Sequence, residues 1–148
     1  MIPDKLDQKI LKHLLVDARQ SSRQLALKLG VSTVTIISRL KKLQAEKIIK
    51  GYTAILDHEK LGFNLTAVIE VVARKDKIIE IENELADIDN ICAVYDVTGT
   101  TDTFIVAKFK GRDDLSEFVK KISSKPNVEN TITHVVLNTI KEDFRLTL

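Results

Sequence analysis

The stretch LALKLGVSTVTIISRLKKL, residues 25–43, contains two helical patterns separated by a very short turn. Apolar residues recur every three or four positions on both sides of Gly30-Val31-Ser32, as expected for one face of a helix. Gly30 favours the left-handed conformation that ends many helices, and Ser32 is a favoured N-cap residue for the next helix. Because so short a turn makes the two helices cross steeply, the stretch predicts a helix-turn-helix.

A further helix is expected before this pair. Asp4 is a favoured N-cap residue, and the apolar residues after it keep the 3.6-residue spacing of a helix: Leu6, Ile10, Leu14 and Leu15. The second helix has two candidate caps, Ser21 and Ser22. The first third of the chain is therefore predicted to be a three-helix domain.

The pattern changes after Gly51. Residues 52–56, YTAIL, have the composition of a short strand, so we predict a winged form of the helix-turn-helix. A polar connector follows as far as Gly62. We therefore expect a helix-turn-helix domain in residues 1–57, a linker in residues 58–63 and a second domain in residues 64–148.

The second domain repeats a strand–helix–strand pattern twice. The expected elements are a strand at 65–73, a helix at 77–86, strands at 93–98 and 103–109, a helix at 113–123 and a strand at 130–138. This order predicts an α+β chain whose second domain is a ferredoxin-like βαββαβ fold, with two helices on one face of a four-stranded antiparallel sheet. The loop at residues 99–102 is expected to connect the two central strands.

The other face of this sheet is expected to be covered by a second copy of the chain. The strand at residues 65–72, LTAVIEVV, is apolar on both sides, so neither side suits exposure to water. A partner sheet is the simplest cover. The sequence therefore predicts a homodimer formed through the sheets.

The net charge of +2 is unevenly distributed. Residues 1–57 hold 11 Lys and Arg against 5 Asp and Glu, whereas the remainder holds 12 against 16. A basic segment joined to an acidic one indicates two domains, the first of which faces a polyanion. No apolar run approaches the ~20 residues that span a bilayer, and the start lacks a signal-peptide pattern, so we expect a cytoplasmic protein. The single cysteine, Cys92, is expected to be a small core residue.

The polar side of the helix after Ser32 is suited to the major groove of DNA. Between Ser32 and Ala45 there is no acidic residue, whereas an ordinary solvated amphipathic helix, the alternative interpretation, usually carries Glu among its lysines. Small side chains admit a helix backbone to the ~12 Å groove, hydroxyls bond to base edges, and cations neutralise phosphates. Backbone N–H groups at the start of the preceding helix offer a second phosphate contact. The candidate DNA-binding residues are Ser22, Arg23, Thr33, Val34, Thr35, Ser38, Arg39, Lys41 and Lys42.

No catalytic set is evident. His13, His58 and His134 lie in three different elements, without the spacing of paired metal ligands. We therefore expect no enzyme activity, no metal and no cofactor. The loop from Gly99 to Asp102 has two interpretations: a plain turn capped by Asp102, or a site whose backbone N–H groups bind a carboxylate while Asp102 binds an ammonium.

Several short motifs recur in a characteristic order along nearly the whole chain. They are Leu6-Asp7 with Ile10-Leu11, Ala18-Arg19, residues 24–32, residues 39–43, residues 48–52, Leu61-Gly62, and residues 94–99 with Asp102. Each motif alone is unspecific, but their order and spacing together are specific. On these motifs the chain resembles the Lrp/AsnC family, the leucine-responsive and asparagine-type transcriptional regulators of bacteria and archaea.

The resemblance implies a βαββαβ effector domain that dimerises through its sheets, assembly of dimers into larger, often octameric, rings, and gene regulation tuned by amino acids. It also favours the ligand interpretation of the loop, because effectors of the family bind at a Gly-x-x-Asp loop between dimers. The candidate effector-binding residues are Thr98, Gly99, Thr100, Thr101 and Asp102, with Thr131, Thr133 and His134 in the last strand. The family more often has an aromatic or acidic residue where this chain has Thr100-Thr101, so the ligand's identity stays open.

Two alternatives of other classes also start from this resemblance. Some Lrp/AsnC-like proteins are sirohaem decarboxylases, which need cationic and His side chains in the second domain to bind a polycarboxylate. Here that domain is net acidic, and His134 is its only histidine. A pure amino-acid sensor without DNA binding is disfavoured by the basic helix. The expected partners are double-stranded DNA, further copies of the chain and a free amino acid.

Overall fold

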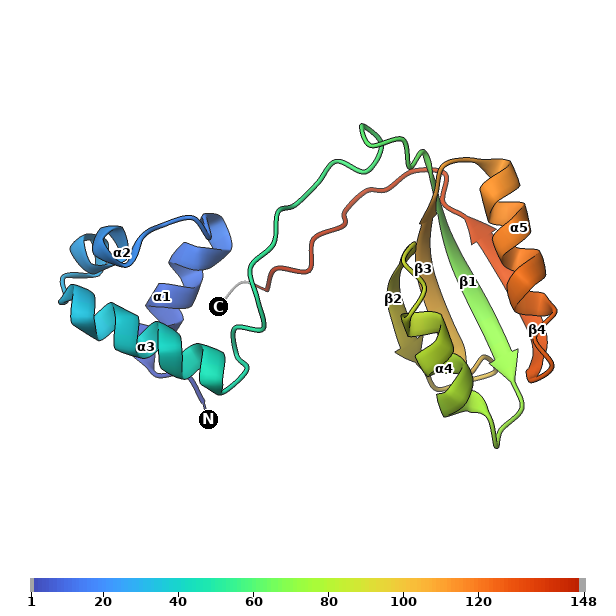
Figure 1. Ribbon diagram of the computed structural model, residues 1–148, viewed down its shortest axis with the longest axis horizontal. Helices are drawn as coiled ribbons and strands as arrows, with labels where there is room; N and C mark the ends of the chain where they lie inside the picture. The colour runs from blue at the N-terminus through green and yellow to red at the C-terminus, as the bar shows by residue number, and fades with distance from the viewer. Residues whose placement is uncertain (1, 147–148) are drawn as a thin grey trace. The chain divides into compact units, whose positions relative to one another are not determined.

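The structure, a computed structural model, describes residues 2–146 and divides into two compact units. Residues up to Ile55 and from Lys141 onward form one unit, and Leu56–Ile140 form the other. The first unit contains three helices, and the second contains a four-stranded sheet with two helices, as can be followed in Figure 1. Within the described residues, no helix has both the length and the apolar character needed to cross a bilayer.

The N-terminal unit contains α1 (Lys5–Val16), α2 (Ser22–Leu29) and α3 (Thr33–Ala45). Each helix begins where the sequence predicts. Asp4 caps α1 and Ser32 caps α3, while Ser21, the first of the two candidate serines, caps α2. The three helices bury one apolar cluster, consisting of Ile10, Leu25, Ala26, Ile36 and Leu43.

The second unit is a βαββαβ domain. Its elements are β1 (Leu65–Ala73), α4 (Ile78–Ala86), β2 (Ile91–Asp96), β3 (Thr103–Phe109), α5 (Arg112–Ser123) and β4 (Val128–Val135). The strands are antiparallel in the order β2-β3-β1-β4. The predicted ferredoxin-like arrangement is confirmed, and each element lies within a few residues of its predicted place.

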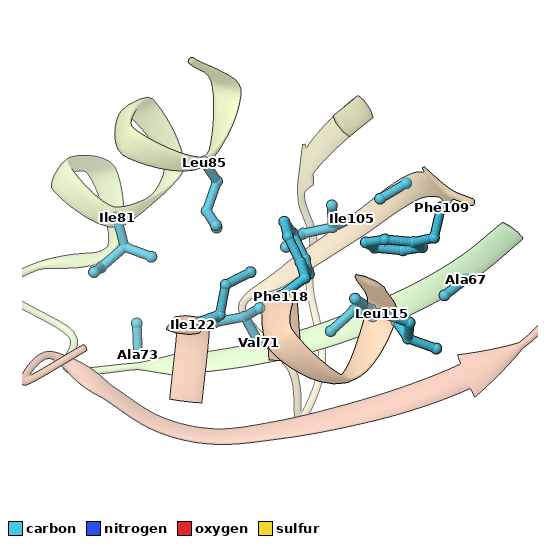
Figure 2. Close-up of a cluster of buried hydrophobic side chains, with 12 residues drawn as sticks. Ala67, Val71, Ala73, Ile81, Leu85, Ile105, Phe109, Leu115, Phe118 and Ile122 are labelled. Carbon is cyan, nitrogen blue, oxygen red and sulfur yellow. The ribbon is translucent and has the colours of Figure 1, made fainter. Parts of the chain in front are cut away.

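Both helices of the second unit pack on the same face of the sheet, where the core lies. Figure 2 shows Leu85 of α4 and Phe118 and Ile122 of α5 among the side chains of the strands. The Phe109 and Phe118 rings meet edge to face with centroids 5.0 Å apart, a favourable aromatic geometry. Along β1, alternate residues from Ala67 to Ala73 face this core, so the residues between them lie on the opposite, open face.

The open face is largely apolar, as the sequence predicts. Residues on this face are identified by the pleat of β1 and by the pairing register. They include Val68, Val72, Tyr95, Phe104, Val106 and Ile132. Tyr95 and Ile132 are each 45% exposed, and the others are half-buried. An apolar surface of this extent, which Glu70 and His134 interrupt, marks an interaction site.

Three sequence predictions, two about connections and one about Cys92, are wrong. Residues 52–56 form no strand, and no backbone hydrogen bond pairs them with another described segment. The winged form is therefore not observed. The loop after β2 joins an edge strand to a central strand, rather than two central strands. Cys92 is exposed, because it lies in the edge strand where the register with β3 shifts between Ile91 and Ala93.

The last described residues depart from the predicted domain division. The sequence places everything after residue 63 in the second domain, whereas residues from Lys141 onward belong to the N-terminal unit. Arg145 Nη1 donates to the carbonyl oxygen of Leu15 at 3.3 Å, near the end of α1. The same guanidinium lowers the pKa of Asp143 to about 2 through a side-chain hydrogen bond. The N-terminal unit is thus built from two separate parts of the sequence.

Candidate nucleic-acid interface and ligand loop

The turn between α2 and α3 is fixed by local hydrogen bonds. The Ser21 hydroxyl accepts from the Gln24 N–H at 3.2 Å, and the Gln24 side chain accepts from the Ser21 N–H at 2.8 Å. At the other end of α2, Gly30 adopts the left-handed conformation with φ 67°. The Ser32 hydroxyl then accepts from the Thr35 N–H at 3.0 Å and starts α3. These bonds hold α3 in a defined direction on the domain.

The predicted recognition face of α3 is exposed. Val34 is 76% exposed, and Ser38, Lys41 and Lys42 are also exposed. Thr33 is half-buried beside them. No acidic residue occurs in α3, so this face combines small side chains with two cations. Such a surface can approach both base edges and phosphates.

Three further candidates, Thr35, Ser22 and Arg23, lie at the starts of α3 and α2. The half-buried Thr35 hydroxyl shares a hydrogen bond of 2.8 Å with the Ser32 hydroxyl. Arg23 is exposed in the first turn of α2, and Ser22 beside it is half-buried. The first turn of a helix presents N–H groups that no helical carbonyl accepts, which suits a phosphate.

Arg39 lies apart from this surface. Its Nη1 atom donates to the Asp4 carboxylate and lies 3.2 Å from Asp7 Oδ1. Asp7 is 1% exposed, so the guanidinium points toward α1 and the domain interior. The pKa of Arg39 is raised, chiefly by its hydrogen bond to Asp4. The pKa of Asp4 is lowered by the Asp7 N–H and then by Arg39. The sequence prediction of a direct DNA contact at Arg39 does not fit this arrangement.

The loop from Val97 to Asp102 closes the β2–β3 hairpin. The Val97 N–H donates to the Asp102 carbonyl oxygen at 2.9 Å. At its tip, Thr98, Gly99 and Thr100 are exposed, and Gly99 has φ 126°, which disfavours any other residue. The tip thus presents backbone groups with little side-chain bulk, as the ligand interpretation requires.

Asp102 has a structural contact that the sequence does not reveal. Its Oδ2 atom accepts a hydrogen bond of 2.9 Å from the backbone N–H of Ala73, at the end of β1. Asp102 was predicted to accept a ligand's ammonium group, but one of its oxygens holds the loop against the sheet. The loop is anchored by the same carboxylate that was expected to bind a ligand.

A further acid, Glu70, joins the loop to the last strand. The buried Thr101 hydroxyl donates to Glu70 Oε2, and His134 Nε2 lies 2.8 Å from Glu70 Oε1. The pKa of Glu70 is lowered by the Thr101 hydrogen bond and then by that of His134. Glu70 is not among the candidate residues predicted from the sequence. A single acid within an otherwise apolar strand was the available signal.

The structure separates the remaining candidates of β4. His134 pairs in register with Val68 and lies on the open face with Glu70. Thr131 and Thr133 pair with Val71 and Ile69, so they lie on the helix-covered side of the sheet. The Thr131 hydroxyl there shares a hydrogen bond of 2.8 Å with Ser123 of α5. His134 is therefore linked to the loop through Glu70, whereas Thr131 and Thr133 face away from that network. Among the described residues, no group of His, Cys, Asp and Glu is arranged to hold a metal ion.

Comparison with known proteins gives two family matches, one over the helices of the N-terminal unit and one over the second unit together with the residues that follow it. Residues 4–44 match the AsnC-type helix-turn-helix domain, and residues 66–146 match the Lrp/AsnC ligand binding domain. An uncharacterized HTH-type transcriptional regulator of Pyrococcus furiosus is 48% identical over 143 residues, which cover 97% of each chain. These relatives are regulators, and the decarboxylase alternative finds no support among them.

Solved structures agree with these matches. A transcriptional regulator of Neisseria meningitidis, in complex with L-methionine, is 29% identical with a TM-score of 0.89, covering 97% of this chain and 95% of that one. AsnC of E. coli is 26% identical with a TM-score of 0.89, covering 97% of each chain. The chain belongs to the Lrp/AsnC family of transcriptional regulators, with an AsnC-type helix-turn-helix domain followed by a ligand-binding domain.

Proposed function

We propose that this regulator recognises specific DNA sequences with α3 in the major groove. The observation that carries the proposal is the exposed face of α3, which has no acidic residue and follows a hydrogen-bonded turn. Val34 and Ser38 would contact base edges, together with Thr33 and Thr35. Lys41 and Lys42 would neutralise phosphates, and the first turn of α2, with Ser22 and Arg23, would hold a further phosphate.

DNA binding is tested by the salt dependence and the sequence dependence of affinity. A dimer that makes ~8 phosphate contacts should have a log–log salt slope near −7. Lys42→Ala should weaken binding to all sequences alike and flatten the slope by roughly one or two units. Ser38→Ala should instead change base preference, by ~1–3 kcal/mol for a lost base contact. If neither substitution altered binding to a duplex selected from random sequence, α3 would not be the recognition helix.

A second part of the proposal is that the open face of the sheet is the dimer interface. Members of this family oligomerise, and this face offers apolar residues from all four strands. The occupant is a second copy of the chain, because an isologous contact would cover the same apolar residues on both protomers at once. We further propose that dimers assemble into larger rings of octamer size. Light scattering on the full-length protein gives the mass that tests both steps.

The ligand-binding domain is proposed to bind a free α-amino acid at the β2–β3 loop. An amino acid offers a carboxylate and an ammonium a few ångströms apart, so it needs N–H donors beside an anion. The tip at Thr98, Gly99 and Thr100 offers backbone N–H groups, and Asp102 and Glu70 are the nearby carboxylates. His134 would complete the polar surroundings through Glu70. The relative from Neisseria meningitidis in complex with L-methionine supports this class of ligand.

Calorimetric titration of the wild-type protein with the common amino acids tests this site. Binding of at least one amino acid tighter than millimolar is the expected result. If none binds, the loop is a plain turn and regulation does not use an amino acid there. DNA binding with and without the bound amino acid then shows whether the ligand acts on the promoter complex.

A further inference from the structure

The contact between α1 and α3 centres on a buried carboxylate. Asp7 of α1 is 1% exposed, and both of its carboxylate oxygens lie within 3.3 Å of Arg39 Nη1. The Arg39 side chain is 30% exposed and also donates to the Asp4 carboxylate. A guanidinium between two carboxylates is a strong and geometrically specific contact. It therefore joins two helices that are 32 residues apart at the Asp7–Arg39 pair.

The same two carboxylates also fix the start of α1. Asp4 Oδ1 accepts from the N–H groups of Leu6 and Asp7, each at 2.9 Å. The Asp4 N–H in turn donates to Asp7 Oδ2 at 3.2 Å. Because the start of α1 is held by this reciprocal pair, Asp4 and Asp7 present a rigid acceptor surface to Arg39. We call Asp4, Asp7 and Arg39 the clamp.

The position of the clamp on α3 relates it to the recognition face. Arg39 directly follows Ser38 and precedes Lys41 and Lys42, all three of which are exposed. The buried residues Ile36 and Leu43 anchor the other side of the helix through apolar contacts, which are not directional. The clamp adds hydrogen bonds, which are directional, and so constrains rotation of α3 about its own axis. Base recognition needs that rotation to be held within about 10–20°.

We propose that Arg39 is a positioning residue for DNA recognition, which sets the orientation of α3 through its ion pair with Asp7 and does not contact DNA itself. The proposal rests on the proposed role of α3 in the groove. It differs from the ordinary interpretation of an arginine on a recognition helix, which would be a phosphate or guanine contact.

The two interpretations predict opposite effects of Asp7→Asn on the affinity for DNA. Asp7→Asn removes a negative charge from a domain that binds a polyanion, so charge alone would strengthen DNA binding or leave it unchanged. If Asp7 holds Arg39 in place, the same substitution weakens binding to the specific sequence, because α3 is no longer held at the required angle. Asp17→Asn is the matched control, since Asp17 is an exposed carboxylate in the same unit that makes no contact with Arg39.

The experiment uses the full-length protein and a fluorescent duplex that the wild type has selected from a random pool, with a scrambled duplex for comparison. Fluorescence anisotropy gives the dissociation constants of both duplexes at salt concentrations from about 50 to 200 mM. Over this range, phosphate contacts make the affinity depend strongly on salt. We expect Asp7→Asn and Arg39→Gln each to lower the ratio of specific to non-specific affinity about tenfold, comparable to the loss of one base contact. Their salt slopes should equal that of the wild type, and Asp17→Asn should keep the wild-type ratio.

The ratio of specific to non-specific affinity is not changed by a simple loss of folded protein. A smaller folded fraction lowers specific and non-specific binding by the same factor, so it leaves the ratio unchanged. Arg39→Lys provides a second variant, which keeps the charge but carries it on a shorter side chain without the planar guanidinium. We expect it to lower the ratio as well. If Arg39 acted only by its charge near phosphates, Arg39→Lys would be neutral.

Two results would contradict the proposed positioning role of Arg39. One is a flattened salt slope in Arg39→Gln together with a wild-type ratio in Asp7→Asn, which would make Arg39 a phosphate contact. The other is a wild-type ratio in all the clamp variants, which would leave Arg39 without a role in recognition. The ratio of specific to non-specific affinity in the wild type tests the proposed DNA recognition separately. A wild type that does not discriminate between the two duplexes would contradict the proposed DNA recognition, whatever the variants do.

Discussion

At the scale of single residues, Asp102 has two roles that chemistry can separate. Its Oδ2 atom accepts from the Ala73 N–H, a role that an amide oxygen also fills, whereas binding an ammonium requires the charge. We therefore predict that Asp102→Asn weakens amino-acid binding about tenfold or more, since a charge-assisted contact is worth ~1.5–3 kcal/mol.

The matched variant is Asp102→Ala, which removes both roles. It should lose the same binding and also about 1 kcal/mol of unfolding free energy, because the Ala73 N–H loses its acceptor. Calorimetry measures the binding, and chemical unfolding measures the stability. Equal stability losses in the two variants would show that the Ala73 contact does not hold the loop.

Glu70 gives the second prediction at this scale, a dependence of stability on pH. The pKa of Glu70 is lowered in the folded protein by Thr101 and then by His134. A lowered pKa stabilises the fold above the unfolded value of about 4.3, and this contribution disappears as the pH falls through the folded value. Wild type should therefore lose its advantage over Glu70→Gln in acid. Thermal unfolding at pH 6 and at successively lower pH measures the difference, and a constant difference would contradict the network.

At the scale of elements, β1 is the strand whose two sides have different roles. Val68 lies on the open face, whereas Ile69 is 1% exposed in the core beneath the helices. We predict that Val68→Lys breaks the dimer and leaves a folded protomer, because the charge then lies where a second sheet would pack. Ile69→Lys should instead prevent folding, because an unpaired charge would be buried. Sedimentation with circular dichroism separates the outcomes, and a Val68→Lys dimer of wild-type affinity would place the interface elsewhere.

The same elements show how far the sequence determined the structure. Helix starts were predictable because Asp4, Ser21 and Ser32 cap through contacts with residues two or three positions away. The strands of the second unit were predictable from their alternating or continuous apolar pattern. Residues 52–56 were not, because a strand exists only beside another strand, and composition does not reveal the neighbour.

The candidate sites were less predictable, for a related reason. The exposed face of α3 follows from helix periodicity, and the sequence identified it. Arg39, Asp102 and Glu70 each depend on a partner about 30 or more residues away in sequence. A charge on a helix or in a loop looks the same in the sequence whether it faces DNA, a ligand or another helix. Only the folded arrangement distinguishes these cases.

At the scale of the whole molecule, the chain passes between its two units twice. It leaves the N-terminal unit after Ile55 and returns to it at Lys141. We predict that deletion of residues 141–148 loosens the end of α1, where Arg145 bonds to the Leu15 carbonyl, and leaves the sheet unchanged. A cation at a helix C-terminus is worth typically 0.3–1 kcal/mol, so the effect should be local.

Hydrogen exchange is the appropriate measurement for that deletion. Amides in the last turn of α1 should exchange faster, while those of β1 keep their rates. Arg74→Ala serves as the control, because Arg74 pairs with Asp76 within the second unit. Faster exchange throughout β1 in the deletion variant would mean that the last residues support the second unit instead.

The discontinuous N-terminal unit also determines the order in which the protein is completed during translation. Its three helices leave the ribosome first, but Arg145 follows only after all of Leu56–Ile140 has been made. At 5–20 residues per second, synthesis of that intervening segment takes roughly 4–17 s. The three helices therefore have that time to pack before the contact with Arg145 can form. A newly made chain thus assembles the helices that are proposed to bind DNA before the end of α1 gains its last contact.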